Sequence, residues 1–400
     1  MLFEIAKKQA LTAVAFRSVS KLRETVTGGD GFGGGIGIDE MTYLKWLGLT
    51  AKVGQRNRQV TEACVELVGQ LAHDGLKSCI LKGQSNLIYY PEELRDCRTA
   101  GDIDIWVQPM EESGLEIAVG DLDSSTGSGQ VPRGAHYERF AGNRGVIEYA
   151  KMMWRLKGEK DAPDMRFHHI DFPDVGDVAV EMHFRPMFCD SPLRCYRFLK
   201  WCRENEQFGV CDALINGCVL PVPTASFNAV YQLMHIQRHL VDEGVGLRQL
   251  LDYYFVLRAL HIEQGSLGDR TESMAQWVEG MGVSVMPNKE ICRLLKNFGL
   301  YHLTGALMYV LQTVFAMPDE YLICQPNEKE GKFLLSEIMQ AGNFGKYDDR
   351  IKHGGTQSQH AWEKTKHNLR LLTHYPEEVL WEPFFRVYHW VWRKLELWRY

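Results

Sequence analysis

The sequence predicts an α+β fold, in which a small mixed β-sheet unit lies between an N-terminal helical segment and a C-terminal helical domain. Apolar residues recur at helical spacing in the first and last parts of the chain, whereas short strand-like runs bounded by Gly and Pro gather between them. The chain has 400 residues, which at roughly 100–200 residues per domain favours two or three domains. We therefore expect a helical segment over 1–75, an α/β unit over 76–222 and a helical domain over 223–400.

The composition is that of a folded protein that does not wrap on duplex nucleic acid. Hydrophobic residues make up 45% and charged residues 24% of the chain, which excludes a disordered or coiled-coil protein. The 45 Lys and Arg are outnumbered by 51 Asp and Glu, so we expect no duplex nucleic acid partner. Ten cysteines without a Cys-x-x-Cys pair favour reduced thiols, and no apolar run reaches about 18 residues. These features predict a cytoplasmic protein without a transmembrane segment.

In the N-terminal segment, helical stretches are expected on both sides of a glycine-rich loop over 28–37. Residues 29–34 fit Gly-x-Gly-x-x-Gly, but the dinucleotide-binding fingerprint needs a preceding strand, and a helical pattern precedes it here. The loop is therefore interpreted as a flexible connector. Asp39 is the expected N-cap of a helix that begins near Glu40 and continues to about His73.

Four strands are expected in the middle of the chain. They fall at 78–81, 103–107, 168–172 and 178–184, with a helical turn at 86–90 and a helix at 146–157. A polar stretch over about 110–145, with a loop at 124–129, separates the second strand from this helix. Beyond Pro221 the pattern is helical throughout, with Thr224 as the N-cap of one helix and Gly246 at the start of the next.

The pair Asp102 and Asp104 is the strongest chemical feature of the sequence. Alternation along a strand places both carboxylates on one face, while Ile103 and Ile105 point to the other. Like charges about 6–7 Å apart repel, and both stay ionised cheaply only when a cation lies between them. Mg²⁺ or Mn²⁺ suits such oxygen ligands, and two solvated surface aspartates are the alternative. A similar pair at 121–123 runs into a Ser/Gly loop and is interpreted as solvated.

A third carboxylate is expected to join this pair. Glu181 lies on the most regularly alternating strand, and His183 follows two residues later on the same face. Glu181 can therefore complete a metal site of three carboxylates. The neighbouring His168, His169 and His183 raise zinc as an alternative, but we favour histidines that pack or contact substrate, because no Cys/His spacing of a structural zinc site accompanies them.

Basic and small residues near these carboxylates are candidates for phosphate binding. Lys82, Gly83 and Ser85 form a turn between a strand and a helical start, where free backbone N–H groups can hold phosphate oxygens. Arg95 and Arg98 precede Asp102 and could bind phosphates as bidentate donors, although solvated surface positions are the default for either.

Taken together, these residues resemble the polymerase-β-type nucleotidyltransferase superfamily, and more closely its bacterial nucleotidyltransferase-like family. The likeness covers about residues 76–256. It is carried by Leu81-Lys82-Gly83, Tyr90-Pro91, Arg98, Asp102-Ile103-Asp104, Glu181-Met182-His183-Phe184, His235, His239 and the run 246–252. The resemblance implies that 76–222 is the catalytic domain.

The resemblance also implies roles for single residues. Asp102 and Asp104 would bridge two Mg²⁺ (or Mn²⁺) ions, and Glu181 would hold the ion that activates the acceptor hydroxyl. Gly83 with Ser85 would cradle the triphosphate. In this chain Gln84 separates Gly83 from Ser85, so Lys82 is expected to take over part of that contact.

The implied function is a metal-dependent nucleotidyltransferase. It would move a nucleoside monophosphate from an NTP such as ATP to an acceptor hydroxyl on a small molecule, saccharide or protein, with release of pyrophosphate. The alternatives are a non-catalytic nucleotide-binding or scaffold protein and a metal-dependent phosphohydrolase. The NTP is expected to enter between the α/β unit and the helical domain.

Further candidates lie in the helical domain. His235 and His239 are spaced i, i+4 on one predicted helix and share a face, and with His183 and Arg248 they are candidate cleft contacts; core packing is the alternative. The aromatic and basic run over 381–400 reads as a helix with Pro383 near its first turn. We expect its stripe of Phe385, Tyr388, Trp392 and Leu395 to dock on the helical core, with contact at a membrane surface as the alternative.

Overall fold

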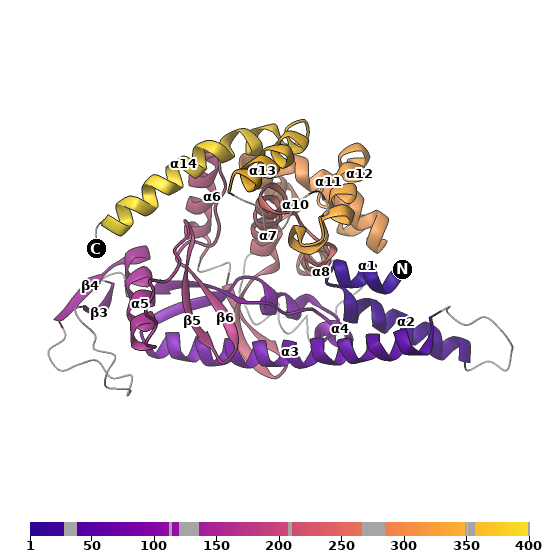
Figure 1. Cartoon of the computed structure of the whole chain (residues 1–400), viewed down its shortest axis with the longest axis horizontal. Coiled ribbons are helices and arrows are strands. Elements are labelled where there is room, and N and C mark those ends of the chain that lie inside the picture. The colour runs from indigo at the N-terminus through magenta and orange to yellow at the C-terminus, as the bar shows by residue number, and fades with distance from the viewer. Residues whose placement is uncertain are drawn as a thin grey trace.

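The computed structural model of the chain describes residues 1–27, 38–111, 114–119, 136–206, 210–265, 285–348, 350 and 357–398. Its helices surround a small mixed sheet, with helical segments at both ends of the chain, so the predicted α+β class is confirmed (Figure 1). The glycine-rich loop 28–37, the acidic pair at 121–123 and the loop 124–129 lie outside the described residues.

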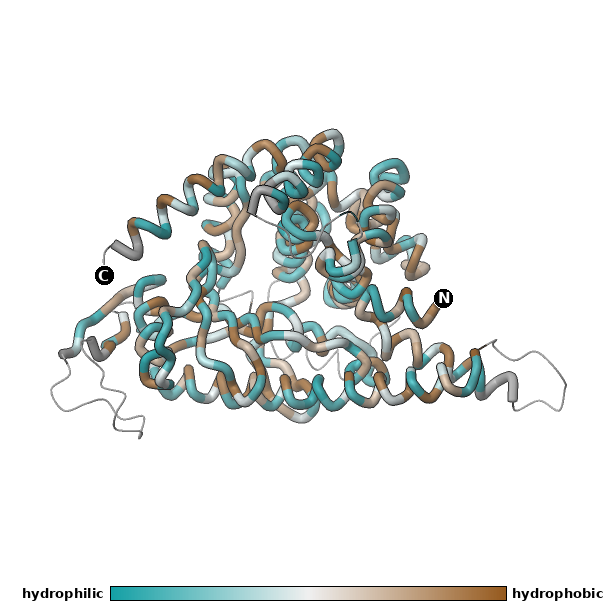
Figure 2. Tube along the Cα trace, viewed as in Figure 1, coloured by the Kyte–Doolittle hydropathy of each residue, from teal (hydrophilic) through white to brown (hydrophobic). Residues whose placement is uncertain are grey.

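Three helices make up the described part of the N-terminal segment. They are α1 (Leu2–Lys8), α2 (Thr12–Thr27) and α3 (Glu40–His73). The Asp39 side chain accepts a hydrogen bond from the Thr42 backbone N–H at 2.9 Å, which confirms the predicted N-cap of α3. Apolar and polar residues alternate along α3 (Figure 2). Its C-terminal half packs on the sheet through residues such as Cys64 and Leu67, and its N-terminal part packs through Trp46 on α1 and α2.

Four strands make the central sheet, close to where the sequence predicts them. They are β1 (Leu76–Ile80), β2 (Ile103–Pro109), β5 (His169–Val175) and β6 (Val178–His183), in the order β1-β2-β6-β5. Strands β2 and β6 are parallel, and the other two pairs are antiparallel. Ile103 and Ile105 are buried in the core shared with α3, so the opposite face of β2 carries Asp104.

Several elements between 83 and 223 surround this sheet. They are η1 (Gly83–Tyr89), α4 (Glu92–Arg95), β3 (Leu115–Val119), β4 (His136–Phe140), α5 (Gly142–Leu156), α6 (Pro192–Glu204), β7 (Val210–Ile215) and β8 (Cys218–Pro223). The antiparallel pair β3/β4 occupies part of the polar stretch over 110–145, where no strand is predicted from the sequence. The hairpin β7/β8 is a second difference. Its turn residues Asn216 and Gly217 have φ of +50° and +81°, as the Asn-Gly signal for a tight hairpin demands.

The C-terminal half is helical, as predicted. It contains α7 (Ala225–Asp242), α8 (Leu247–Glu263), α10 (Asn288–Asn297), α11 (Tyr301–Phe315), η3 (Asp319–Tyr321), α12 (Glu328–Ala341), η4 (Asn343–Gly345), α13 (Gln357–Leu371) and α14 (Pro376–Trp398). Thr224 caps α7 by accepting a hydrogen bond from the Phe227 N–H. One apolar core joins these helices to Leu81 and Trp106 of the α/β unit, so the helical half packs directly on the sheet.

The C-terminal helix α14 differs from its prediction in two ways. It begins at Pro376, so Pro383 lies inside the helix and not in its first turn. Of the predicted apolar stripe, Phe385 is buried against Phe167 and Phe188, whereas Tyr388 and Leu395 are more than half exposed. None of the described helices is long and apolar enough to cross a membrane.

Candidate active site

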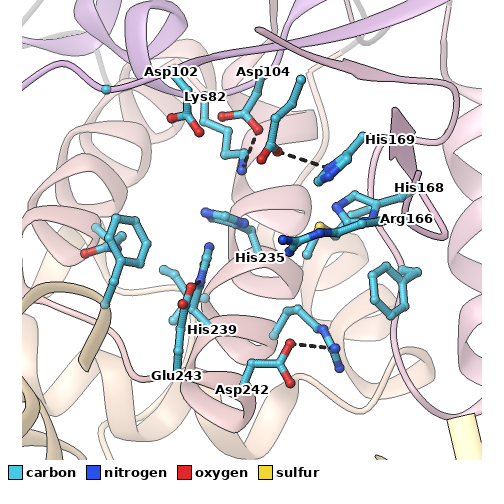
Figure 3. Close-up of a pocket in the computed structure, with 18 of the residues that line it drawn as sticks. Lys82, Asp102, Asp104, Arg166, His168, His169, His235, His239, Asp242 and Glu243 are labelled. Atoms are coloured by element: carbon cyan, nitrogen blue, oxygen red, sulfur yellow. Dashed lines mark hydrogen bonds and ion pairs between the residues drawn. The ribbon is translucent and has the colours of Figure 1, made fainter. Parts of the chain in front are cut away.

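A cavity of about 1250 Å³ lies where the sheet, α7, α8 and α14 meet. The sheet side contributes Asp102, Asp104 and Glu181, while α7 contributes His235 and His239 from the opposite wall (Figure 3). The cavity therefore lies between the α/β unit and the helical half, where the sequence predicts entry of the nucleotide.

The carboxylates of Asp104 and Glu181 are brought together by strand pairing. The two residues are register partners on the parallel strands β2 and β6, so their side chains leave the sheet on the same face. Asp104, Glu181 and His183 each offer a ligand atom within 4.8 Å of the other two. Asp102, which precedes β2, is exposed and lines the same cavity beside Asp104.

Negative charge exceeds positive charge at this face. The Lys82 ammonium lies 2.8 Å from Asp104 Oδ1. Burial acts to lower the pKa of Lys82, but the carboxylates of Asp104, Glu181 and Asp102 raise it above its ordinary value. The Asp104 carboxylate, together with burial, raises the pKa of Asp102. One lysine thus faces three carboxylates that disfavour one another's ionised forms.

Three histidine rings lie next to the carboxylates. His183 Nε2 is 3.0 Å from Asp104 Oδ1, and its Nδ1 is 3.2 Å from the carbonyl oxygen of Pro186. His169 Nδ1 is 3.0 Å from Glu181 Oε2. Burial opposes ionisation of Glu181, but His169 and His183 outweigh it and lower the pKa of this carboxyl. Burial, with His183 and His169 nearby, lowers the pKa of His168, which favours its neutral form.

Of the predicted phosphate-binding turn, Lys82 and Gly83 line the cavity and Ser85 does not. Gly83 adopts φ +63°, a conformation that favours glycine. The Gln84 side chain turns toward α3, where its Nε2 donates to Thr61 Oγ1 at 2.7 Å. Ser85 is fully buried in η1. The extra residue Gln84 thus places the Ser85 hydroxyl away from the site.

The two predicted arginines are engaged elsewhere. Arg98 is 4% exposed and binds Asp252 of α8 in a bidentate manner, with both hydrogen bonds at 2.8 Å. Tyr90 donates to the same carboxylate at 2.7 Å. Arg98 therefore lines the cavity while tying the α/β unit to the helical half. Arg95 lies outside the cavity lining, and its Nε donates to the Tyr90 carbonyl oxygen at 3.3 Å.

The predicted cleft contacts from the helical half do line the cavity. The His235 and His239 rings lie 4.2 Å apart between centroids, as expected for i, i+4 neighbours. His239 Nδ1 is 2.7 Å from Glu243 Oε1. Arg248 donates from Nη1 to the Thr99 carbonyl oxygen at 2.9 Å. These side chains form the wall that faces the carboxylates.

Sequence reasoning did not place several other residues at this cavity. They include Arg166, Asp190, Arg238, Lys346, Phe385 and Arg393. The sequence offers one usable signal, since Arg238 follows His235 by one helical turn and so shares its face. The remainder come from loops and from α14, more than 150 residues after Glu181 in several cases, and only tertiary packing brings them together.

Comparison with known proteins gives one family. No curated protein and no solved structure matches the chain. A family model described as an uncharacterised nucleotidyltransferase matches residues 2–275, which is more than half of the chain and includes all three carboxylates. The family expected from the sequence motifs is therefore confirmed, and membership supports a general nucleotidyltransferase role. The chain belongs to this uncharacterised nucleotidyltransferase family.

Proposed function

We propose that the chain is a metal-dependent nucleotidyltransferase that moves a nucleoside monophosphate from an NTP to an acceptor hydroxyl and releases pyrophosphate. Family membership supports the general role. The observation that carries the finer proposal is the pairing of Asp104 with Glu181 on adjacent parallel strands, beside Asp102, at the wall of a large cavity.

The side chains present fit a divalent metal ion. Three carboxylates supply the oxygen ligands that Mg²⁺ and Mn²⁺ prefer, and the raised pKa of Asp102 reflects negative charge that a cation would neutralise. Asp102, Asp104 and Glu181 would hold the metal. When bound, two such ions would stabilise charge on the triphosphate and increase the nucleophilicity of the acceptor oxygen.

Side chains of the chain itself can bind the nucleotide and keep the charges that this needs. The raised pKa of Lys82 keeps its ammonium charged, so it can exchange its contact with Asp104 for a phosphate oxygen. The lowered pKa of Glu181 suits a carboxylate that stays ionised as a ligand, and not a general base. In the reaction, a bond forms between the acceptor oxygen and the α-phosphorus, the bond to the α,β-bridging oxygen breaks to release pyrophosphate, and the acceptor hydroxyl loses its proton to solvent.

The cavity is large enough for two substrates. Pockets for one small ligand commonly have volumes of roughly 300–1,000 Å³, and this cavity has about 1250 Å³. Lys82 and the carboxylates lie at its sheet side, while Asp190, Arg238 and Phe385 line the region near α14. We place the triphosphate at the sheet side and the acceptor toward α14.

Mass spectrometry tests this proposal. The chain is incubated with all four NTPs, Mg²⁺ or Mn²⁺ and a cell extract, and is compared with Asp102→Asn/Asp104→Asn and with the control Asp177→Asn, an exposed aspartate paired with Arg56. We expect acceptors that gain the mass of a nucleoside monophosphate with the wild type and the control only. NTP binding without any transfer would favour a scaffold protein, and release of orthophosphate to water would favour a phosphohydrolase.

A further inference from the structure

The carboxylate site contains nitrogen donors in addition to oxygen ligands. His183 is fully buried and lies between Asp104 and Pro186. A carbonyl oxygen can only accept a hydrogen bond, so the contact with Pro186 places a proton on His183 Nδ1. In the neutral ring, Nε2 then presents a lone pair to the carboxylates of Asp104 and Glu181, at 3.0 and 3.7 Å.

With the ring neutral, a divalent ion between Nε2 and the carboxylates would satisfy the lone pairs on both sides. Nitrogen and oxygen ligands lie about 2.0–2.2 Å from a bound zinc ion, so two adjacent ligands are separated by about 3.0–3.5 Å. The distance from His183 Nε2 to Asp104 Oδ1 is 3.0 Å, and that from His169 Nδ1 to Glu181 Oε2 is also 3.0 Å. Both separations fit neighbouring ligands of one ion, and they equally fit a hydrogen bond from a protonated ring nitrogen.

A buried nitrogen without a hydrogen-bond partner gives a second, independent observation. Among the described residues, His168 Nδ1 makes no hydrogen bond, although its side chain is more than nine-tenths buried. One ligand atom from each of His168, His169 and His183 lies within 4.8 Å of the other two. A buried polar atom without a partner is costly, and metal coordination would satisfy it.

We propose that His183 Nε2 is a direct metal ligand together with Asp104 and Glu181, and that the site therefore selects an imidazole-binding ion such as Zn²⁺ or Co²⁺ over Mg²⁺. The hydrogen bond from Nδ1 to Pro186 is the outer contact that orients such a ligand. His169 is the nearest further nitrogen donor, beside Glu181. Imidazole is a poor ligand for Mg²⁺ and a good one for the later divalent ions.

This inference rests on the proposed function only for the identity of the site. It adds a role for Lys82, whose ammonium contacts the same oxygen of Asp104 as His183 does. A divalent ion at that oxygen repels the ammonium. Metal binding would thus release Lys82 toward the triphosphate.

The first test uses the wild-type chain without any substitution. The chain is treated with a chelator, loaded with Mn²⁺ and studied by pulsed electron paramagnetic resonance in the absence of nucleotide. We expect coupling to an imidazole ¹⁴N nucleus, which only a directly bound histidine gives. A spectrum with oxygen and water ligands alone would overturn the proposal and would leave His183 as a protonated partner of Asp104.

The second test compares metal affinities. Zn²⁺, Co²⁺ and Mg²⁺ are titrated into the wild type, His183→Gln and the control His367→Gln, which removes a buried histidine that contacts the Leu240 carbonyl oxygen away from the cavity. We expect His183→Gln to lose at least about 10-fold in Zn²⁺ and Co²⁺ affinity, with less than about 3-fold change for Mg²⁺. If the folded His183→Gln variant binds Co²⁺ with unchanged affinity and an unchanged visible Co²⁺ spectrum, His183 is not a metal ligand.

These outcomes are separable from those of the proposed function. A chain that binds Mn²⁺ through imidazole but transfers no nucleoside monophosphate keeps this inference and loses the proposed function. A chain that transfers a nucleoside monophosphate with Mg²⁺ but shows only oxygen ligands in the Mn²⁺ spectrum keeps the proposed function and loses this inference.

Discussion

Two groups of charged side chains line the same cavity and differ in their charge balance. The carboxylate cluster, Asp102, Asp104 and Glu181, has three acidic groups around one lysine, Lys82. The Arg98–Asp252 pair is matched one to one, fully buried and bidentate. In a buried pair of opposite charges, each charge neutralises the other, and the pair can hold two elements together. A cluster with more negative than positive charges keeps its affinity for a cation. The difference separates the candidate catalytic groups from the structural ones.

The largest expected effect on activity comes from Asp102→Asn in the carboxylate cluster. Asp102 is exposed and its pKa is raised by Asp104, so removal of its charge relieves repulsion and costs little stability. We expect nucleotidyl transfer to fall by about 10³-fold, or about 4 kcal/mol, because a metal ligand is lost. Steady-state kinetics and thermal unfolding measure the two quantities. A large drop in melting temperature with retained activity would place Asp102 in the same class as Asp252.

The same change from Asp to Asn in the Arg98–Asp252 pair should reduce stability more than it reduces activity. Asp252→Asn leaves the Arg98 guanidinium buried without its counter-ion, so we expect the free energy of unfolding to fall by about 3–5 kcal/mol. Denaturant unfolding measures it. The double variant Arg98→Met/Asp252→Leu should recover most of this loss, since it removes both charges. Full stability of Asp252→Asn would show that the pair does not tie the two halves together.

A smaller effect tests which basic side chain, Lys82 or Arg95, contacts the phosphates of the NTP. Lys82 lines the cavity and contacts Asp104, while Arg95 lies outside the lining. We expect Lys82→Gln to raise KM for the NTP by about 10-fold, or about 1.4 kcal/mol, through loss of a phosphate contact. Arg95→Gln serves as the matched control and should change KM by less than about 2-fold. Equal increases in KM for the two variants would show that Arg95 contacts the phosphates as Lys82 does.

The smallest effect extends the comparison to Glu263, a carboxylate that contacts the Ala225 backbone N–H at 3.4 Å. Burial raises its pKa from 4.5 to about 8. Between these values the folded chain keeps a proton that the unfolded chain has lost, so this residue lowers stability as the pH rises. We expect Glu263→Gln to gain about 1 kcal/mol over the wild type from pH 6 to pH 7. A pH-independent difference in melting temperature would exclude this titration.

The sequence predicts the fold where local signals agree with tertiary contacts. The four strands of the central sheet and the N-caps Asp39 and Thr224 follow from alternation and capping chemistry, which are local. The β3/β4 pair is missed because each strand has only five residues and β4 is mostly polar, although β3 is mostly apolar. The hairpin at Asn216 and Gly217 does carry a local signal, and a closer reading of that dipeptide predicts it.

The candidate site is predictable only in part, for a physical reason. Asp102, Asp104 and Glu181 can be read from strand alternation, because alternation fixes which face a side chain takes. Alternation cannot show that the Arg98 side chain is satisfied by Asp252, 154 residues away. Nor can it show that Gln84 turns toward α3 and carries Ser85 out of the site. Those outcomes depend on partners that only the folded chain supplies.

Isotope labelling tests the central claim most directly. The chain is incubated with a divalent metal and the cell extract that contains the acceptor. One reaction receives NTPs labelled at the α-phosphorus, and a second receives NTPs labelled at the γ-phosphorus. The account predicts that the α-label becomes attached to an acceptor, that the γ-label appears in pyrophosphate, and that Asp102→Asn abolishes both. Appearance of the γ-label as orthophosphate, with no α-label on any acceptor, would contradict it.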